Sequence, residues 1–94
     1  MLSFMLSLKV KPESIARAEK ALSEIDSQAN THEGVIHFMW FQHKDEPVRF
    51  SLIESWRNQQ LLDAHIAKIL DIWNEFTPCL DGEPVSTKLS KLIQ

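Results

Sequence analysis

The residues of this chain best suited to chemistry are a histidine and the acidic and aromatic side chains that precede it. The segment 49–56 ends in Glu54-Ser55-Trp56, and His65 follows nine residues after the tryptophan. On a helix of 100° per residue, His65 lies about 60° from the centre of the predicted apolar stripe, at the edge of the face turned toward the sheet. A partly desolvated imidazole at that place would act as a general base or anchor a substrate hydroxyl. The alternative interpretation is a structural histidine, hydrogen-bonded to backbone or to a partner chain.

Trp56 and Glu54 share one face of the predicted strand. Trp56 is interpreted either as a residue that lines a substrate cavity or as a core aromatic side chain. Because an unpaired buried carboxylate is costly, we expect Glu54 to have a partner. The simpler expectation is an ion pair with Arg57, Lys68 or a base of a partner chain. The more specific one is that Glu54 orients His37 on the neighbouring strand.

The sequence contains no recognisable cofactor or metal motif. His37 and His43 share a strand face but lie about 20 Å apart at the usual strand rise, too far for one metal ion. Gly34 and Gly82 are the only glycines, which excludes a glycine-rich dinucleotide loop. Cys79 lies at a helix end, where no helix N-terminus would lower its pKa. We therefore expect neither a cofactor nor a metal.

Composition indicates one small domain spanning residues 1–94. The net charge is −3, with 10 basic and 13 acidic residues, and no basic cluster marks a nucleic-acid binder. No segment approaches the ~20 apolar residues of a membrane span. A single cysteine and the absence of a signal-peptide pattern favour a cytoplasmic protein.

The first half of the chain predicts a strand and an amphipathic helix. Apolar and polar residues alternate over 2–10, as in a strand with one buried face. Pro12 suits the first turn of a helix. An apolar stripe at steps of three and four then follows, made of Ile15, Ala18, Leu22, Ile25 and Ala29. The segment 30–34 ends this helix.

Residues 35–43 and 48–56 predict an antiparallel hairpin joined by a short polar loop. The first of these strands is apolar on both faces, with Ile36, Phe38 and Trp40 on one and Val35, Met39 and Phe41 on the other. One helix layer covers only one face of a sheet. We therefore expect the other face to meet a second copy of the same sheet.

The second half predicts a helix from the Asn58 cap to about residue 77 and a last strand over 85–93. Its apolar stripe comprises Leu62, Ile66, Ile69, Trp73 and Phe76, and the same spacing continues to Leu80 after the helix ends. The resulting order βαββαβ is typical of an α+β fold of the ferredoxin-like type with an antiparallel sheet.

The strand ending in Glu-x-Trp, the downstream histidine and the Glu-Gly before the second strand together resemble the antibiotic biosynthesis monooxygenase family over nearly the whole chain. The resemblance implies a dimeric α/β barrel, a homodimer. It also implies a cofactor-independent monooxygenase that acts on a small aromatic or quinol-like molecule and O2. The alternative is a non-catalytic dimer of the same fold that binds a small ligand or has a structural role.

Within this resemblance, His65 is the catalytic candidate, and the candidate substrate-binding residues are Trp56, Trp40, Trp73, Leu52, Ile69 and His37. Members that oxidise phenolic polyketides carry Asn, Tyr and Arg at positions that match Leu52, Leu62 and Phe76 here. Positions matching the haem-degrading Asn, Trp and His carry Met5, His65 and about Glu75, which excludes haem degradation. The resemblance thus implies a drier pocket than in those relatives.

Overall fold

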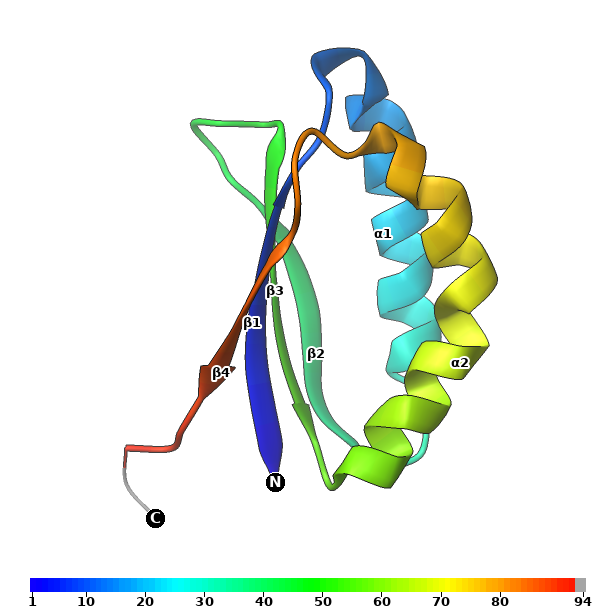
Figure 1. Ribbon diagram of the computed structural model, residues 1–94, viewed down its shortest axis with the longest axis vertical. Helices are drawn as coiled ribbons and strands as arrows, with labels where there is room; N and C mark the ends of the chain where they lie inside the picture. Colours follow the sequence, from blue (N-terminus) through cyan, green and yellow to red (C-terminus); the bar gives the residue numbers. More distant parts are fainter. Residues whose placement is uncertain (93–94) are drawn as a thin grey trace.

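The four strands pair into one antiparallel sheet in the order β2-β3-β1-β4, and both helices pack against the same face of it (Figure 1). The computed structural model describes residues 1–92. Its strands are β1 (Leu2–Lys9), β2 (Val35–Gln42), β3 (Arg49–Trp56) and β4 (Val85–Leu89), and its helices are α1 (Ile15–Ala29) and α2 (Gln59–Phe76). Short 3-10 turns at Pro12–Ser14 and Thr77–Cys79 precede α1 and follow α2. The element order confirms the predicted ferredoxin-like α+β fold.

Alternation of side chains along the strands separates the two faces of the sheet. In β1 and β3 the paired residues Leu8 and Phe50, and Leu6 and Leu52, point toward the helices. The next residues along each strand, such as Met5 opposite Ile53, point to the open face. The period of two read from the sequence is therefore the period observed.

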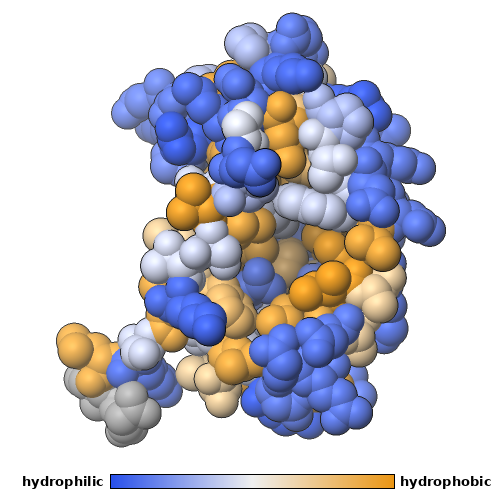
Figure 2. Space-filling view, viewed as in Figure 1, coloured by the Kyte–Doolittle hydropathy of each residue, from blue (hydrophilic) through white to orange (hydrophobic). Residues whose placement is uncertain are grey.

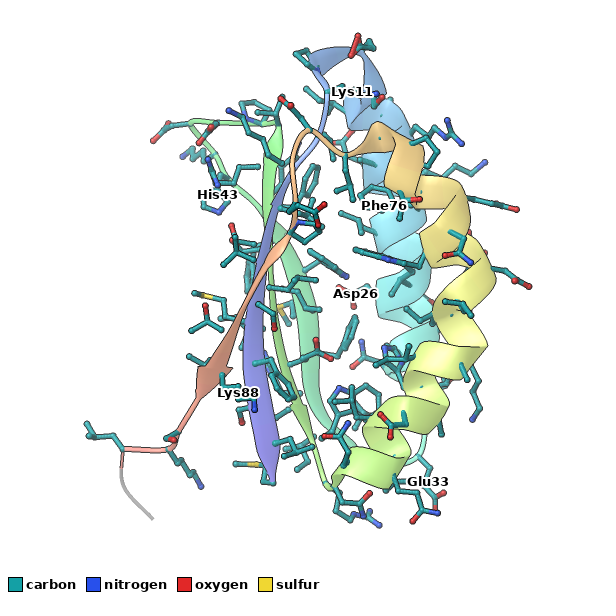
Figure 3. The ribbon with its side chains drawn as sticks, in the orientation of Figure 1. Lys11, Asp26, Glu33, His43, Phe76 and Lys88 are labelled. Atoms are coloured by element: carbon teal, nitrogen blue, oxygen red, sulfur yellow. The ribbon has the colours of Figure 1, made fainter. Side chains whose placement is uncertain are left out.

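Helix α1 buries the apolar stripe expected of it, and α2 begins at the expected cap. In α1 the buried residues are Ala18, Leu22, Ile25 and Ala29. At the start of α2, Asn58 Oδ1 accepts a hydrogen bond of 2.9 Å from the Leu61 amide, which confirms the predicted cap. On α1, Asp26 points toward the sheet, and its Oδ2 accepts a 2.9 Å hydrogen bond from the Trp40 amide of β2 (Figure 3). This bond joins α1 to β2.

Two strand predictions require correction. A β-bulge between Val35 and His37 turns Val35 toward the helices and leaves Ile36 exposed, whereas the sequence placed Ile36 on the face of Phe38 and Trp40. The extra residue of a bulge shifts the alternation by one, which a strict period of two does not anticipate. The last strand ends at Leu89 rather than at residue 93, which lies outside the described residues.

The turn between α1 and β2 is tied to the start of α2. Gly34 has a φ of +88°, and its carbonyl accepts a 2.8 Å hydrogen bond from the Arg57 amide. A Cβ atom on Gly34 would lie only 2.7 Å from Leu61 Cβ. Glycine thus permits both the backbone angle and the close approach of this turn to α2.

The face of the sheet away from the helices is open and partly apolar. Met39, Ile53 and Met5 lie in register across β2, β3 and β1, and each is at least one-third exposed. We call these three residues the open-face row. Phe41 on β2 and Val85 on β4 extend the apolar surface around it. Within residues 1–92, no helix is long and apolar enough to cross a membrane.

Candidate functional site

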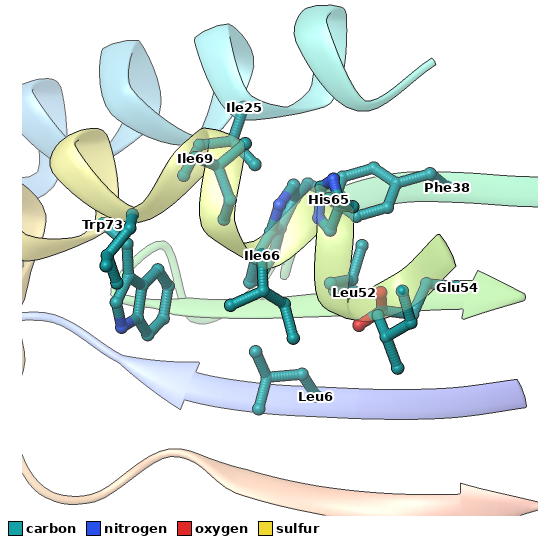
Figure 4. A pocket seen from close by; sticks show the side chains of 12 residues that line it. Leu6, Ile25, Phe38, Leu52, Glu54, His65, Ile66, Ile69 and Trp73 are labelled. Atoms are coloured by element: carbon teal, nitrogen blue, oxygen red, sulfur yellow. The ribbon is translucent and has the colours of Figure 1, made fainter. Parts of the chain in front are cut away.

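A pocket of about 240 Å³ lies between α2 and the helix-covered face of the sheet. Figure 2 shows a hollow at this place, rimmed mainly by hydrophobic surface with hydrophilic surface deep inside it. Among its lining residues are Leu6 of β1, Leu52 and Glu54 of β3, and His65, Ile69 and Trp73 of α2. In Figure 4, Ile66 of α2 faces Leu6 across the pocket.

His65 lies at the centre of the buried face of α2, with a side chain 3% exposed. The sequence placed it at the edge of that face and included in the apolar stripe Ile66, which is 45% exposed. That placement is wrong because α2 lies rotated toward α1 and β3, so the stripe facing the core runs through Leu62, His65 and Ile69. The imidazole stacks on the Trp56 indole, with ring centroids 4.5 Å apart, and meets the edge of Phe38 at 5.2 Å.

The hydrogen-bond partner of His65 is a second histidine, His32. Their Nδ1 atoms are 2.9 Å apart, so one ring donates its Nδ1–H and the other accepts. His32 belongs to the turn between α1 and β2 and is half-buried. The sequence analysis missed this residue, because nothing in the spacing of two histidines 33 positions apart indicates that they meet.

Burial, together with smaller contributions from the neighbouring His32 and Lys68, lowers the pKa of His65 to about 4. Burial also lowers the pKa of His32, with a second contribution from the Lys68 ammonium. Desolvation disfavours the charged imidazolium in both rings. At neutral pH His65 is therefore an unprotonated imidazole, the form that acts as a base.

Glu54 accepts a hydrogen bond of 2.7 Å from Trp56 Nε1. Burial raises the pKa of the Glu54 carboxyl, and the bond from Trp56 acts in the opposite direction. Among the described residues Glu54 forms no ion pair with Arg57 or Lys68, and its hydrogen bond goes to Trp56 rather than to His37. His37 pairs with Ser55 in register and is exposed on the open face, so it lies on the other side of the sheet from Glu54.

The structure brings five of the seven predicted site residues to the pocket: His65, Trp40, Trp73, Leu52 and Ile69. Trp56 is fully buried and supports the His65 ring from beneath instead of lining the pocket. His37 is separated from the pocket by the sheet, since alternation along β2 directs it away from the face of Phe38 and Trp40. Trp40 Nε1 is a buried donor without a hydrogen-bond partner among the described residues.

The described part of the chain holds no group of three or more His, Cys, Asp or Glu side chains arranged to bind a metal ion. His43 was weighed together with His37 as a metal ligand in the sequence. In the structure it shares a 2.8 Å hydrogen bond with Ser51 Oγ (Figure 3). Cys79 is buried.

The sequence matches the family model described as antibiotic biosynthesis monooxygenase over residues 1–68. A fold of this type with a pocket between sheet and helix agrees with that match. The chain belongs to this family. No curated protein matches the sequence.

Solved structures share the fold across almost the whole chain. One is an antibiotic biosynthesis monooxygenase with 18% identity, a TM-score of 0.91 and coverage of 98% of this chain and 99% of its own. A protein of Nitrosomonas europaea has 20% identity, a TM-score of 0.90 and the same coverage. A conserved protein of Methanosarcina mazei has 24% identity, a TM-score of 0.83 and coverage of 97% and 94%. At these identities the likeness shows the fold alone.

Proposed function

We propose that this protein is a cofactor-independent monooxygenase that oxidises a small aromatic or quinol-like substrate with O2. The observation that supports the proposal most directly is His65, an unprotonated base at a pocket with a largely apolar lining. Electron-rich phenols and quinols reduce O2 more readily once they are deprotonated. A neutral imidazole beside a dry cavity is suited to that step.

In this proposal His65 Nε2 takes the proton of a substrate hydroxyl, because its Nδ1 is already bonded to His32. The Trp40 and Trp73 indoles line the pocket beside the substrate ring, and Leu52 and Ile69 supply further apolar contact. The substrate itself provides the electrons that reduce O2. Neither a flavin nor a metal is then required.

The sparse polarity of the pocket favours a substrate with few polar groups. The lining residues with polar side-chain atoms are His65, Glu54 and Trp40, whose Nε1 is buried and has no hydrogen-bond partner among the described residues. A buried donor without a partner costs about 1–3 kcal/mol, and a ligand oxygen would relieve that cost if it reached Trp40 Nε1. A small aromatic ring carrying one or two hydroxyl or carbonyl groups fits this set.

We also propose that a second copy of the chain covers the open-face row. Met39, Ile53 and Met5 form a contiguous apolar line that the chain's own helices leave uncovered. Sheet-on-sheet packing would bury this line on both copies at once. The pocket lies on the opposite face of each sheet, so the dimer contact leaves it free.

The test measures O2 consumption with 1,4-naphthohydroquinone and with unsubstituted hydroquinone, in buffer that contains a chelator and no flavin. We expect protein-dependent O2 uptake above the autoxidation rate and its loss in His65→Gln. His43→Gln is the matched control, because His43 is exposed beyond the end of β2 and does not line the pocket. Saturable binding of both compounds with no O2 uptake would identify a ligand-binding protein instead and overturn the enzymatic proposal.

A further inference from the structure

The contact between His32 and His65 connects the pocket to the protein surface. His65 is buried and lines the pocket, whereas His32 is half-buried in the turn that follows α1. Their rings lie with centroids 5.1 Å apart at an interplanar angle of 58°, and the two Nδ1 atoms are 2.9 Å apart. A proton on one Nδ1 is thus within transfer distance of the other.

The turn that carries His32 is fixed on several sides. The His32 amide donates to the Ala29 carbonyl at 3.0 Å, and Asn30 Nδ2 donates to the carbonyls of Asp26 and Phe38. The close approach of Gly34 to Leu61 then places this turn one helical turn before His65. The histidine pair is therefore held by the packing of the turn on α2.

A pair of neutral imidazoles joined through their Nδ1 atoms has only two arrangements of protons. If His65 carries its proton on Nδ1, it donates the hydrogen bond to Nδ1 of His32, and His65 Nε2 has a free lone pair. If His32 carries the proton on Nδ1, His65 Nε2 is protonated and serves only as a donor. The second ring therefore decides whether His65 presents a base or a donor to the pocket.

We propose that His32 is a positioning residue that holds His65 in the Nδ1–H form and passes to solvent the proton that Nε2 takes from a bound phenol or quinol. The transfer balances in three steps. The ligand O–H bond breaks as an Nε2–H bond forms on His65. The Nδ1 proton of His65 then moves to Nδ1 of His32, and His32 finally releases its own Nε2 proton to water. Both rings end neutral with exchanged tautomers, and the reverse path returns a proton when the product or water is formed.

The surroundings of the histidine pair favour transfer of the proton from His65 to His32 over an imidazolium kept at His65. Burial opposes an imidazolium at His65 more strongly than at half-buried His32, and the exposed Lys68 ammonium on α2 lowers the pKa of both rings. From β3, the Glu54 carboxyl accepts a hydrogen bond from the Trp56 indole, on which the His65 ring stacks. A proton taken at His65 is thus more stable on the ring nearer to water.

The first test requires no substrate and reads the tautomers by two-bond ¹⁵N–¹H correlation spectra of the uniformly labelled protein at neutral pH. We expect His65 Nδ1 to be of the protonated type and Nε2 to be of the unprotonated type. In His32→Ala this preference should be lost, whereas in His32→Gln it should persist because the side-chain carbonyl oxygen can accept from Nδ1–H. His37→Ala is the matched control. Protonation of His65 at Nε2 in the unaltered protein, or an unchanged tautomer in His32→Ala, would overturn the inference.

The second test follows proton transfer with 4-nitrophenol, whose phenolate absorbs visible light and whose phenol form does not. We expect the unaltered protein to bind it as the phenolate at a pH where the free compound is mostly neutral. His32→Gln should bind it with an affinity within about threefold but ionise a smaller fraction, since the proton then remains on buried His65. Equal ionisation in His32→Gln and in the unaltered protein would contradict the relay.

The relay depends on the proposed function only for its use in turnover, and the two fail separately. If no quinol supports O2 uptake, the monooxygenase proposal fails while the tautomer and 4-nitrophenol results still decide the role of His32. If turnover is found, His32→Gln should lower kcat at least tenfold with little change in KM. A change in KM alone would show that His32 contributes only to ligand binding.

Discussion

The two faces of the sheet are built from the same alternating strands, but the chain's own helices cover only one of them. On the helix-covered face, Leu8, Phe50 and Trp56 are buried by α1 and α2 within one chain. On the open face, Met39, Ile53 and Met5 have no cover from the chain's own helices. The comparison teaches that one chain completes the core on the covered face, which also holds the pocket, and leaves the open face for the association proposed above.

The covered face itself is not uniformly filled. At the end of β3, Trp56 is fully buried and packs against His65 and Phe38. Toward β1 a pocket remains between α2 and the sheet. Solid packing at one end thus fixes the imidazole that the open end can use.

The largest effect on this comparison is expected from Trp56→Ala. Removing a fully buried indole and its bond to Glu54 should lower the free energy of unfolding by about 3–5 kcal/mol. Urea unfolding at a fixed protein concentration measures the change. Phe41→Ala, on the open face, should cost much less when the chain is dilute enough to be monomeric. Equal losses for the two variants would mean that both faces are equally buried within one chain.

Met39→Glu should break the contact of the open face with little damage to the covered face. A carboxylate placed in a sheet-on-sheet interface should weaken association by about 3 kcal/mol, or roughly 100-fold in Kd. Sedimentation equilibrium at micromolar concentration should change from twice the 10.9 kDa chain mass to the chain mass. Gln42→Glu, at the exposed end of the same strand, is the control. A monomer before any substitution would refute the dimer.

The stability of the covered face should depend on pH through the buried His65. The pKa of His65 falls from 6.5 to about 4 on folding, so between these values the unfolded chain binds a proton that the folded chain does not. Its contribution is complete above pH 6.5 and is lost as the pH falls toward 4, with an upper limit of about 3 kcal/mol.

Glu54 partly offsets the increase of stability with pH that His65 produces. Because burial raises its pKa, its contribution is present below its unfolded pKa and is lost as the pH rises through the folded one. Urea unfolding from pH 4 to 7 should therefore show stability rising with pH, and His65→Gln should flatten the rise. A slope unchanged by His65→Gln would show that His65 titrates normally in the folded state.

The smallest effect on stability is expected at the opening of the pocket. Ile66 is 45% exposed on α2 and lines the pocket, so Ile66→Ser should change the free energy of unfolding by less than about 1 kcal/mol. Binding of a small phenol, measured by calorimetry, should still weaken because apolar contact is lost at the rim. Unchanged binding would place the ligand away from this opening.

The sequence alone predicted the fold, because its evidence is local and periodic. The alternation in β1, the stripe of α1 and the Asn58 cap are each recorded within a few consecutive residues. The same regularity identified His65 as a histidine on a sheet-facing helix, and the two-sided strand 35–43 indicated an uncovered face.

Only the tertiary structure decided what surrounds His65. The rotation of α2 moved it from the predicted edge to the centre of the buried face, and the bulge in β2 fixed the directions of Val35 and Ile36. The partnership with His32 joins residues 33 positions apart. It depends on how closely a turn and a helix approach, and that approach is set by the packing of Gly34 against Leu61 rather than by any local pattern. Periodicity specifies which side of an element faces the core, but contacts between elements arise only when their packing fixes distance and rotation.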